Sequence, residues 1–100
     1  AWSNDDSFDT IFSRQIKAFG NEGDVLILLT TSGNSANQIN AAKICKDLKI
    51  DVVSLTGNNG GELLSLSDYN INISSTSTQR IQEMHIMIGH ILCDIIEDSL

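Results

Sequence analysis

Four hydroxyl side chains gather in a short stretch of this chain, and their type and spacing suggest a binding site. They follow an unbroken apolar run that starts at Val25, and a Gly33-Asn34 turn precedes the last of them: Thr30, Thr31, Ser32 and Ser35. A strand that ends in a small polar turn and leads into a helix is where a doubly wound sheet binds its ligand. The helix start offers free N–H groups and a partial positive charge, so an anion is the preferred guest. Hydroxyl donors without a charged side chain suit a phosphate monoester that is held and not cleaved.

The same stretch also has a simpler interpretation, in which Ser35 only caps a helix and Gly33-Asn34 only makes a turn. A short motif is a weak hypothesis by itself, so both interpretations stay open at this point. A second hydroxyl-rich stretch, residues 74–78, also follows an expected strand and leads into a helix.

The elements that must position these residues follow from the apolar periodicity. Strand and helix alternate along the chain, which implies βαβ units and an α/β fold with a parallel sheet. We expect the third strand to be short and nearer an edge of the sheet. The expected strands cover residues 24–29, 50–55 and 70–73, and the expected helices cover residues 8–19, 35–48, 62–66 and 78–97.

Three of these helices carry further expectations. In the helix over residues 35–48, the inward positions are predicted to be Ala36, Ile39, Ala42, Ile44 and Cys45. The last helix has a broad apolar stripe, which suggests burial on more than one side, in a larger sheet or against another subunit. Its apolar positions are Ile81, Met84, Ile86, Ile88, Leu92, Cys93, Ile95 and Ile96. The first helix is expected to be capped by Asp5, Asp6 or Ser7.

Composition excludes several classes of function. The net charge is −7 over 100 residues, which argues against a nucleic-acid partner because such binding needs clustered Lys and Arg. No apolar run approaches the length of a membrane span. Cys45 and Cys93 lack a metal-type spacing and suggest two buried thiols of a reducing compartment, the cytoplasm. With no initial Met, signal-peptide pattern or linker, residues 1–100 are expected to be one domain, or a fragment of one, from a longer chain.

The sequence resembles the SIS (sugar isomerase) domain family and, within it, the phosphoheptose isomerases. The resemblance spans the whole chain, and the order of its blocks is far more specific than any single block. The blocks are Ser3-Asn4-Asp5, Phe12-Ser13-Arg14-Gln15, Gly23-Asp24-Val25-Leu26, Thr31-Ser32-Gly33-Asn34-Ser35-Ala36-Asn37, Leu55-Thr56-Gly57 with Gly60-Gly61, and Arg80-Ile81-Gln82-Glu83-Met84-His85 with His90.

This resemblance implies a three-layer αβα sandwich with a parallel sheet, of flavodoxin-like or Rossmann-like type. Residues 1–100 would form the C-terminal part of a single SIS domain. The implied protein is a nucleotide-independent cytoplasmic isomerase and a homotetramer, with one zinc ion per subunit. It would convert sedoheptulose 7-phosphate to D-glycero-D-manno-heptose 7-phosphate through an enediolate, the first step of bacterial heptose supply for lipopolysaccharide core and other surface glycans.

Site residues carry over from the resemblance position by position. The four hydroxyl residues match the phosphate loop of the family, where the position of Thr30 is more often Ser. Asn4 and Asp5 match a pair that contacts the sugar, and Gln82 matches a residue assigned to both substrate and metal. His90 matches a metal ligand that is also the presumed acid or base, so we expect it to be catalytic. The remaining metal ligands, a His and the Glu that is the presumed base, belong to a helix that precedes this sequence.

Helix geometry qualifies these assignments. Gln82 and His90 are eight residues apart, a rise of about 12 Å on one helix, so His90 is favoured as the ligand and Gln82 as a hydrogen-bond partner of the sugar. His85 and His90 point about 140° apart and cannot serve one site, so His85 is expected at a core or subunit contact. Glu83 is expected to be structural. Residues 1–100 alone are expected to fold poorly and to be inactive.

A second class of function stays open. A non-catalytic SIS protein of the DnaA-initiator-associating type shares the Ile-Gln-Glu-Met-His kind of helix. It lacks the His at the position of His90 and has Arg where Ser32 stands, so these two residues favour the isomerase. A sugar-phosphate-sensing transcription regulator would need a basic helix-turn-helix segment, and this sequence has none.

Overall fold

Three parallel strands form the centre of the structure, a computed structural model that describes residues 10–100. They lie side by side in chain order: β1 (Val25–Leu29), β2 (Asp51–Gly57) and β3 (Tyr69–Ile73). Each crossover passes through a helix, as parallel strands require. The predicted parallel sheet is confirmed, and β3 lies at an edge of it as expected. The second strand continues two residues further than predicted, to Gly57.

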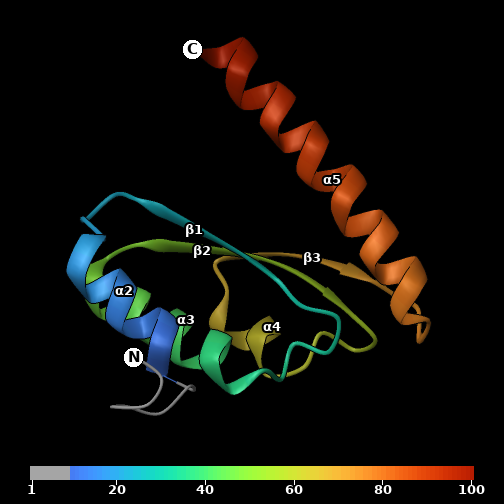
Figure 1. Cartoon of the computed structure of the whole chain (residues 1–100), viewed down its shortest axis with the longest axis horizontal. Helices are drawn as coiled ribbons and strands as arrows, with labels where there is room; N and C mark the ends of the chain where they lie inside the picture. The colour runs from blue at the N-terminus through green and yellow to red at the C-terminus, as the bar shows by residue number, and fades with distance from the viewer. Residues whose placement is uncertain (1–9) are drawn as a thin grey trace.

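Helices cover the two faces of the sheet unequally (Figure 1). Three lie on one face: α2 (Ile11–Phe19), α3 (Ala36–Leu48) and α4 (Leu63–Leu66). α5 (Thr78–Ser99) lies on the opposite face and rises away from the sheet. The predicted three-layer αβα arrangement is therefore present. The caps expected for the first helix, Asp5, Asp6 and Ser7, lie outside the described residues.

The core lies between the sheet and the first three helices. Successive side chains of a strand point to opposite faces, so Leu26 and Leu28 of β1 face the helices. The cluster of buried residues comprises Leu28, Ile39, Ala42, Cys45, Ile50, Val52 and Leu63. Two expectations for α3 were wrong, because Ala36 is exposed and Ile44 is only half-buried. Ala36 is the first residue of the helix and precedes the row that packs on the sheet.

The other face of the sheet is mostly open. Val25, Ile27 and Leu29 of β1 are 58%, 42% and 47% exposed. α5 covers only the end of β2, because its buried side chains are Ile81 and His85, near its start. The remaining apolar stripe of α5 is exposed along much of its length, at Met84, Ile86, Met87, Ile91, Ile95 and Ile96.

The two cysteines differ, contrary to the expectation that both are buried. Cys45 is fully buried in the core, whereas Cys93 is exposed. The reason is that α5 is buried only near its start, at Ile81 and His85, and Cys93 lies about two turns beyond His85. None of the helices in residues 10–100 is both long enough and apolar enough to cross a membrane.

Candidate functional site: the β1–α3 loop

The four hydroxyl residues lie together where β1 ends and α3 begins. The Thr30 N–H donates to the Leu55 carbonyl oxygen at 3.0 Å, so the chain still follows β2 at this point. Gly33 then turns the chain with φ of +73°, a left-handed conformation that glycine adopts without steric cost. The predicted strand, turn and helix are thus all present, at the carboxyl edge of a parallel sheet.

The Ser35 hydroxyl does not cap α3. Ser35 occupies the N-cap position with extended backbone, but its side chain makes no capping hydrogen bond. The first bonds of the helix run instead from the Gln38 and Ile39 N–H groups to the Ser35 carbonyl oxygen, at 3.1 and 3.0 Å. Its Oγ lies 3.5 Å from Thr30 Oγ1. The simpler interpretation of Ser35, as a cap alone, therefore does not account for its side chain.

The loop hydroxyls keep two protons to donate: that of Ser32, and one from Thr30 and Ser35, whose hydroxyls share a hydrogen bond. Thr30 Oγ1 accepts from the Gly33 N–H at 3.3 Å, and Ser32 Oγ accepts from the Asn34 N–H at 3.1 Å. A hydroxyl that accepts through a lone pair still carries its own O–H donor. The Ala36 and Asn37 N–H groups, which precede the first bonds of α3, have no acceptor within the helix. No charged side chain stands between residues 30 and 38, so the loop offers neutral donors around the positive end of a helix, a setting that favours a bound anion.

The loop after β2 holds this first loop in place. The Leu63 N–H donates to the Gly33 carbonyl oxygen at 3.0 Å, and the Glu62 N–H donates to Asn34 Oδ1 at 2.9 Å. The two backbones approach so closely that a Cβ on Gly33 would overlap the carbonyl oxygen of Gly60. Sequence reasoning missed this contact, although the Gly60-Gly61 pair in an otherwise polar loop was a signal for it.

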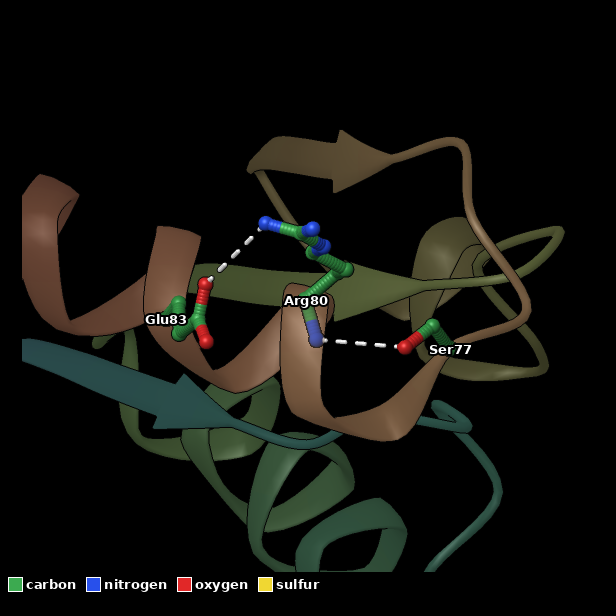
Figure 2. Close-up of polar contacts among 3 residues, drawn as sticks. All are labelled: Ser77, Arg80 and Glu83. Carbon is green, nitrogen blue, oxygen red and sulfur yellow. Dashed lines mark hydrogen bonds and ion pairs between the residues drawn. The ribbon is translucent and has the colours of Figure 1, made fainter.

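The second hydroxyl-rich stretch lies next to that loop. Its residues Ser74, Ser75 and Thr76 line an open pocket of about 640 Å³ together with Asn58 and Asn59. Ser77 then caps α5, because its Oγ accepts from the Arg80 N–H at 3.4 Å (Figure 2). This second stretch therefore serves partly as a cap, unlike Ser35.

Glu83 forms an ion pair with Arg80, with 3.7 Å between Oε2 and Nη1 (Figure 2). Both side chains are largely exposed, and exposed pairs of this kind contribute little to stability. The pair is formed between residues three apart on one helix and gives Glu83 a local partner.

The two histidines of α5 lie in different environments, as their spacing predicted. His85 is 3% exposed, and its Nε2 lies 2.8 Å from the Thr56 carbonyl oxygen. The prediction that His85 makes a core contact is confirmed. His90 is exposed, as is Gln82. No hydrogen bond or ion pair within residues 10–100 connects either of these two to the β1–α3 loop.

The described residues do not make a metal centre by themselves. Among residues 10–100, no group of three His, Cys, Asp or Glu side chains lies close enough together to hold a metal ion. Gln82 and His90 lie on one continuous helix, with a rise of about 12 Å between them. Asn4 and Asp5, the other predicted substrate contacts, lie outside the described residues.

A comparison with models of known protein families identifies the family that contains this strand, loop and helix. The family model described as the SIS domain matches residues 1–57. The chain belongs to the SIS domain family. That match includes β1, the hydroxyl loop, α3 and β2.

Relatives of this SIS domain chain carry a more specific name. It is 48% identical to the phosphoheptose isomerase of Rhodospirillum rubrum, over all of this chain and 53% of that protein. It is 46% identical to that of Aliarcobacter butzleri, again over all of this chain and 53% of the relative. The chain therefore spans about half the length of the curated relatives it matches.

Solved structures agree with the fold. The phosphoheptose isomerase of Neisseria gonorrhoeae superposes with a TM-score of 0.91 at 43% identity, covering 94% of this chain and 54% of that one. The enzyme of Francisella tularensis gives a TM-score of 0.92 at 40% identity, covering 96% and 52%. The resemblance of the sequence to the phosphoheptose isomerases is thus confirmed for both sequence and fold.

Proposed function

We propose that this chain is part of an isomerase that converts sedoheptulose 7-phosphate to D-glycero-D-manno-heptose 7-phosphate, as the first step of bacterial heptose biosynthesis for lipopolysaccharide core and other surface glycans. The observation that carries the proposal is the Ser35 hydroxyl, which lies at the head of α3 without capping it. In this proposal the loop residues Thr30, Thr31, Ser32 and Ser35 bind the phosphate of the substrate. The names of the relatives supply the class of reaction.

The reaction moves a proton between two adjacent carbons through an enediolate. It needs a base at carbon and a proton donor at oxygen. We assign the oxygen role to His90, because imidazole exchanges protons near neutral pH. The loop holds the phosphate at a distance from the reacting carbons, so it contributes binding energy that orients the substrate. Gln82, Asn4 and Asp5 are proposed to hydrogen-bond the sugar, and the base at carbon is proposed to lie outside residues 1–100.

The whole protein is proposed to be cytoplasmic, homotetrameric and independent of nucleotides. Zinc is a further prediction for it, with one ion per subunit, His90 as a ligand and Gln82 as a weaker candidate. The described residues do not fit a metal ion on their own, so the remaining ligands must come from elsewhere. A bound metal would stabilise negative charge on the substrate oxygens.

The test is to replace Ser32 and Ser35 separately by Ala in the full-length protein and to measure consumption of sedoheptulose 7-phosphate. Each change removes a hydrogen bond to a charged group, which should weaken substrate binding by about 1–2 kcal/mol. The KM should therefore rise by roughly 5- to 30-fold.

Ser65→Ala is the matched control. Ser65 is exposed on α4, and within residues 10–100 its hydroxyl bonds only to the Glu62 carbonyl oxygen of its own turn, at 3.1 Å. This variant should keep the wild-type KM. The proposal is wrong if the wild-type protein does not turn over the substrate, and the phosphate assignment is wrong if both loop variants match Ser65→Ala.

A further inference from the structure

Asn58 connects three segments at the carboxyl edge of the sheet. Its side-chain Nδ2 donates to the Thr31 carbonyl oxygen at 3.2 Å, which lies inside the hydroxyl loop. Its backbone N–H donates to the Ser75 carbonyl oxygen at 3.0 Å. Its own carbonyl oxygen accepts from Asn72 Nδ2 at 3.0 Å. One residue therefore connects the loops that follow all three strands.

Asn58 is itself held by a buried polar network between β2 and β3. Asn72 Oδ1 accepts from the Thr56 hydroxyl at 2.8 Å, and Thr56 Oγ1 accepts from Asn70 Nδ2 at 3.0 Å. Asn70 Nδ2 also lies 2.8 Å from Ser54 Oγ. Thr56 and Ser54 are fully buried. Because buried polar groups that are fully hydrogen-bonded make a rigid arrangement, this network fixes the position of the Asn58 backbone.

In the segment after β2, the Asn58 side chain hydrogen-bonds the backbone of the hydroxyl loop. The Leu63 and Glu62 contacts use backbone N–H groups, which a substitution does not remove. Fixing the Thr31 carbonyl sets the Thr31–Ser32 peptide plane, and this plane directs the Ser32 N–H and side chain. The backbone of Asn58 has φ of +55°, a conformation that Asn tolerates better than most residues.

We propose that Asn58 is a positioning residue for phosphate binding: its amide holds the Thr31 carbonyl and so orients the hydroxyl loop toward the anion. The inference rests on the proposed function of that loop. In this role Asn58 acts through Thr31 and does not touch the substrate.

The experiment uses full-length Asn58→Gly and inorganic phosphate as the probe. Glycine keeps the positive φ, the N–H that bonds Ser75 and the carbonyl that accepts from Asn72, so only the bond to Thr31 is lost. The dissociation constant of phosphate, measured by calorimetry, should rise by about fivefold or more in this variant.

Asn21→Gly is the matched control. Asn21 lies in the turn between α2 and β1, at the other end of the sheet, and its side chain bonds only to the Phe19 carbonyl oxygen within the described structure. It should keep the wild-type dissociation constant. A purely structural role for Asn58 would lower the melting temperature and leave phosphate binding unchanged, and that result would overturn the inference alone. A wild-type protein that does not bind phosphate would overturn both the loop assignment and this inference.

Discussion

At the residue scale, Gly33 is constrained both by its positive φ and by the close approach of Gly60, and a comparison with Gly23 separates the two effects. Its φ of +73° favours glycine, and a Cβ there would also overlap the Gly60 carbonyl oxygen. Gly23 has φ of +91°, but a Cβ would meet no other atom within 4 Å. Gly23→Ala should therefore cost only the left-handed strain of about 1–2 kcal/mol. Gly33→Ala should cost about 1–3 kcal/mol more, because the two loops must also move apart.

Denaturation of the two full-length variants by urea gives this difference directly. The phosphate affinity should also fall in Gly33→Ala and not in Gly23→Ala. Equal losses of stability would mean that the close contact between the two loops has no energetic consequence.

Cys45 and Cys93 should differ in reactivity. Burial raises the pKa of the Cys45 thiol above its ordinary value of 9.0, and the nearby Asp68 carboxylate raises it further. The thiolate is the reactive form, so native Cys45 should resist alkylation at pH 8 while exposed Cys93 reacts. Because the folded-state pKa is the higher one, the stability contribution of Cys45 is complete below pH 9 and declines as the pH rises through that folded-state pKa.

Mass spectrometry after brief treatment with iodoacetamide tests this, with protein unfolded in guanidinium as the control in which both thiols react. Rapid labelling of Cys45 in the native protein would contradict its burial.

At the scale of elements, the docking of α5 depends on a small contact. Ile81 lies against Gly57, and His85 bonds the Thr56 carbonyl oxygen. His85→Phe keeps a ring but removes the hydrogen bond from α5 to the Thr56 carbonyl oxygen, which should destabilise the full-length protein by about 0.5–1.5 kcal/mol. Exposed His90 changed to Asn should leave stability unchanged and reduce turnover by a factor of about a hundred or more.

Chemical denaturation and the isomerase assay on both variants separate the two roles. If turnover of His90→Asn stays within a few-fold of wild type, the assignment of His90 to proton transfer is wrong. If His85→Phe is as stable as wild type, the hydrogen bond to Thr56 does not hold α5 on the sheet.

At the scale of the whole molecule, the described chain leaves an apolar face without cover. One row of β1 side chains, part of β3 and most of the α5 stripe are exposed, whereas parallel sheets are normally covered on both faces. Residues 1–100 produced alone should therefore associate or aggregate, and they should have no isomerase activity because the base at carbon is proposed to lie outside residues 1–100. Light scattering and the isomerase assay on this fragment check both expectations.

The control for the fragment is the full-length protein in the same buffer, which should be soluble and active. A soluble monomeric fragment with measurable turnover would contradict both expectations. It would place the base within residues 1–100 and make Glu83 the leading candidate, in spite of its ion pair with Arg80.

The sequence by itself determined the order of the elements and the place of the hydroxyl loop. Apolar periodicity and turn residues are local properties, so strand β1, the turn at Gly33 and the start of α3 were predictable from neighbouring residues. The 140° spacing of His85 and His90 is also a local property, and it separated their environments correctly. Ala36 was misjudged because periodicity does not tell where a helix first meets the sheet.

Only the tertiary structure decided which segments meet. The contact of Gly33 with Gly60 and the bond from Asn58 to Thr31 join residues that are distant in the chain. The Ser35 hydroxyl bonds Thr30 and does not cap α3, which depends on the backbone geometry of the turn. Periodicity carries no information on such contacts, since they depend on how two loops pack at the edge of one sheet. The exposure of Cys93 has the same cause, because α5 is buried only at Ile81 and His85, and periodicity does not tell where along its length a helix leaves the sheet.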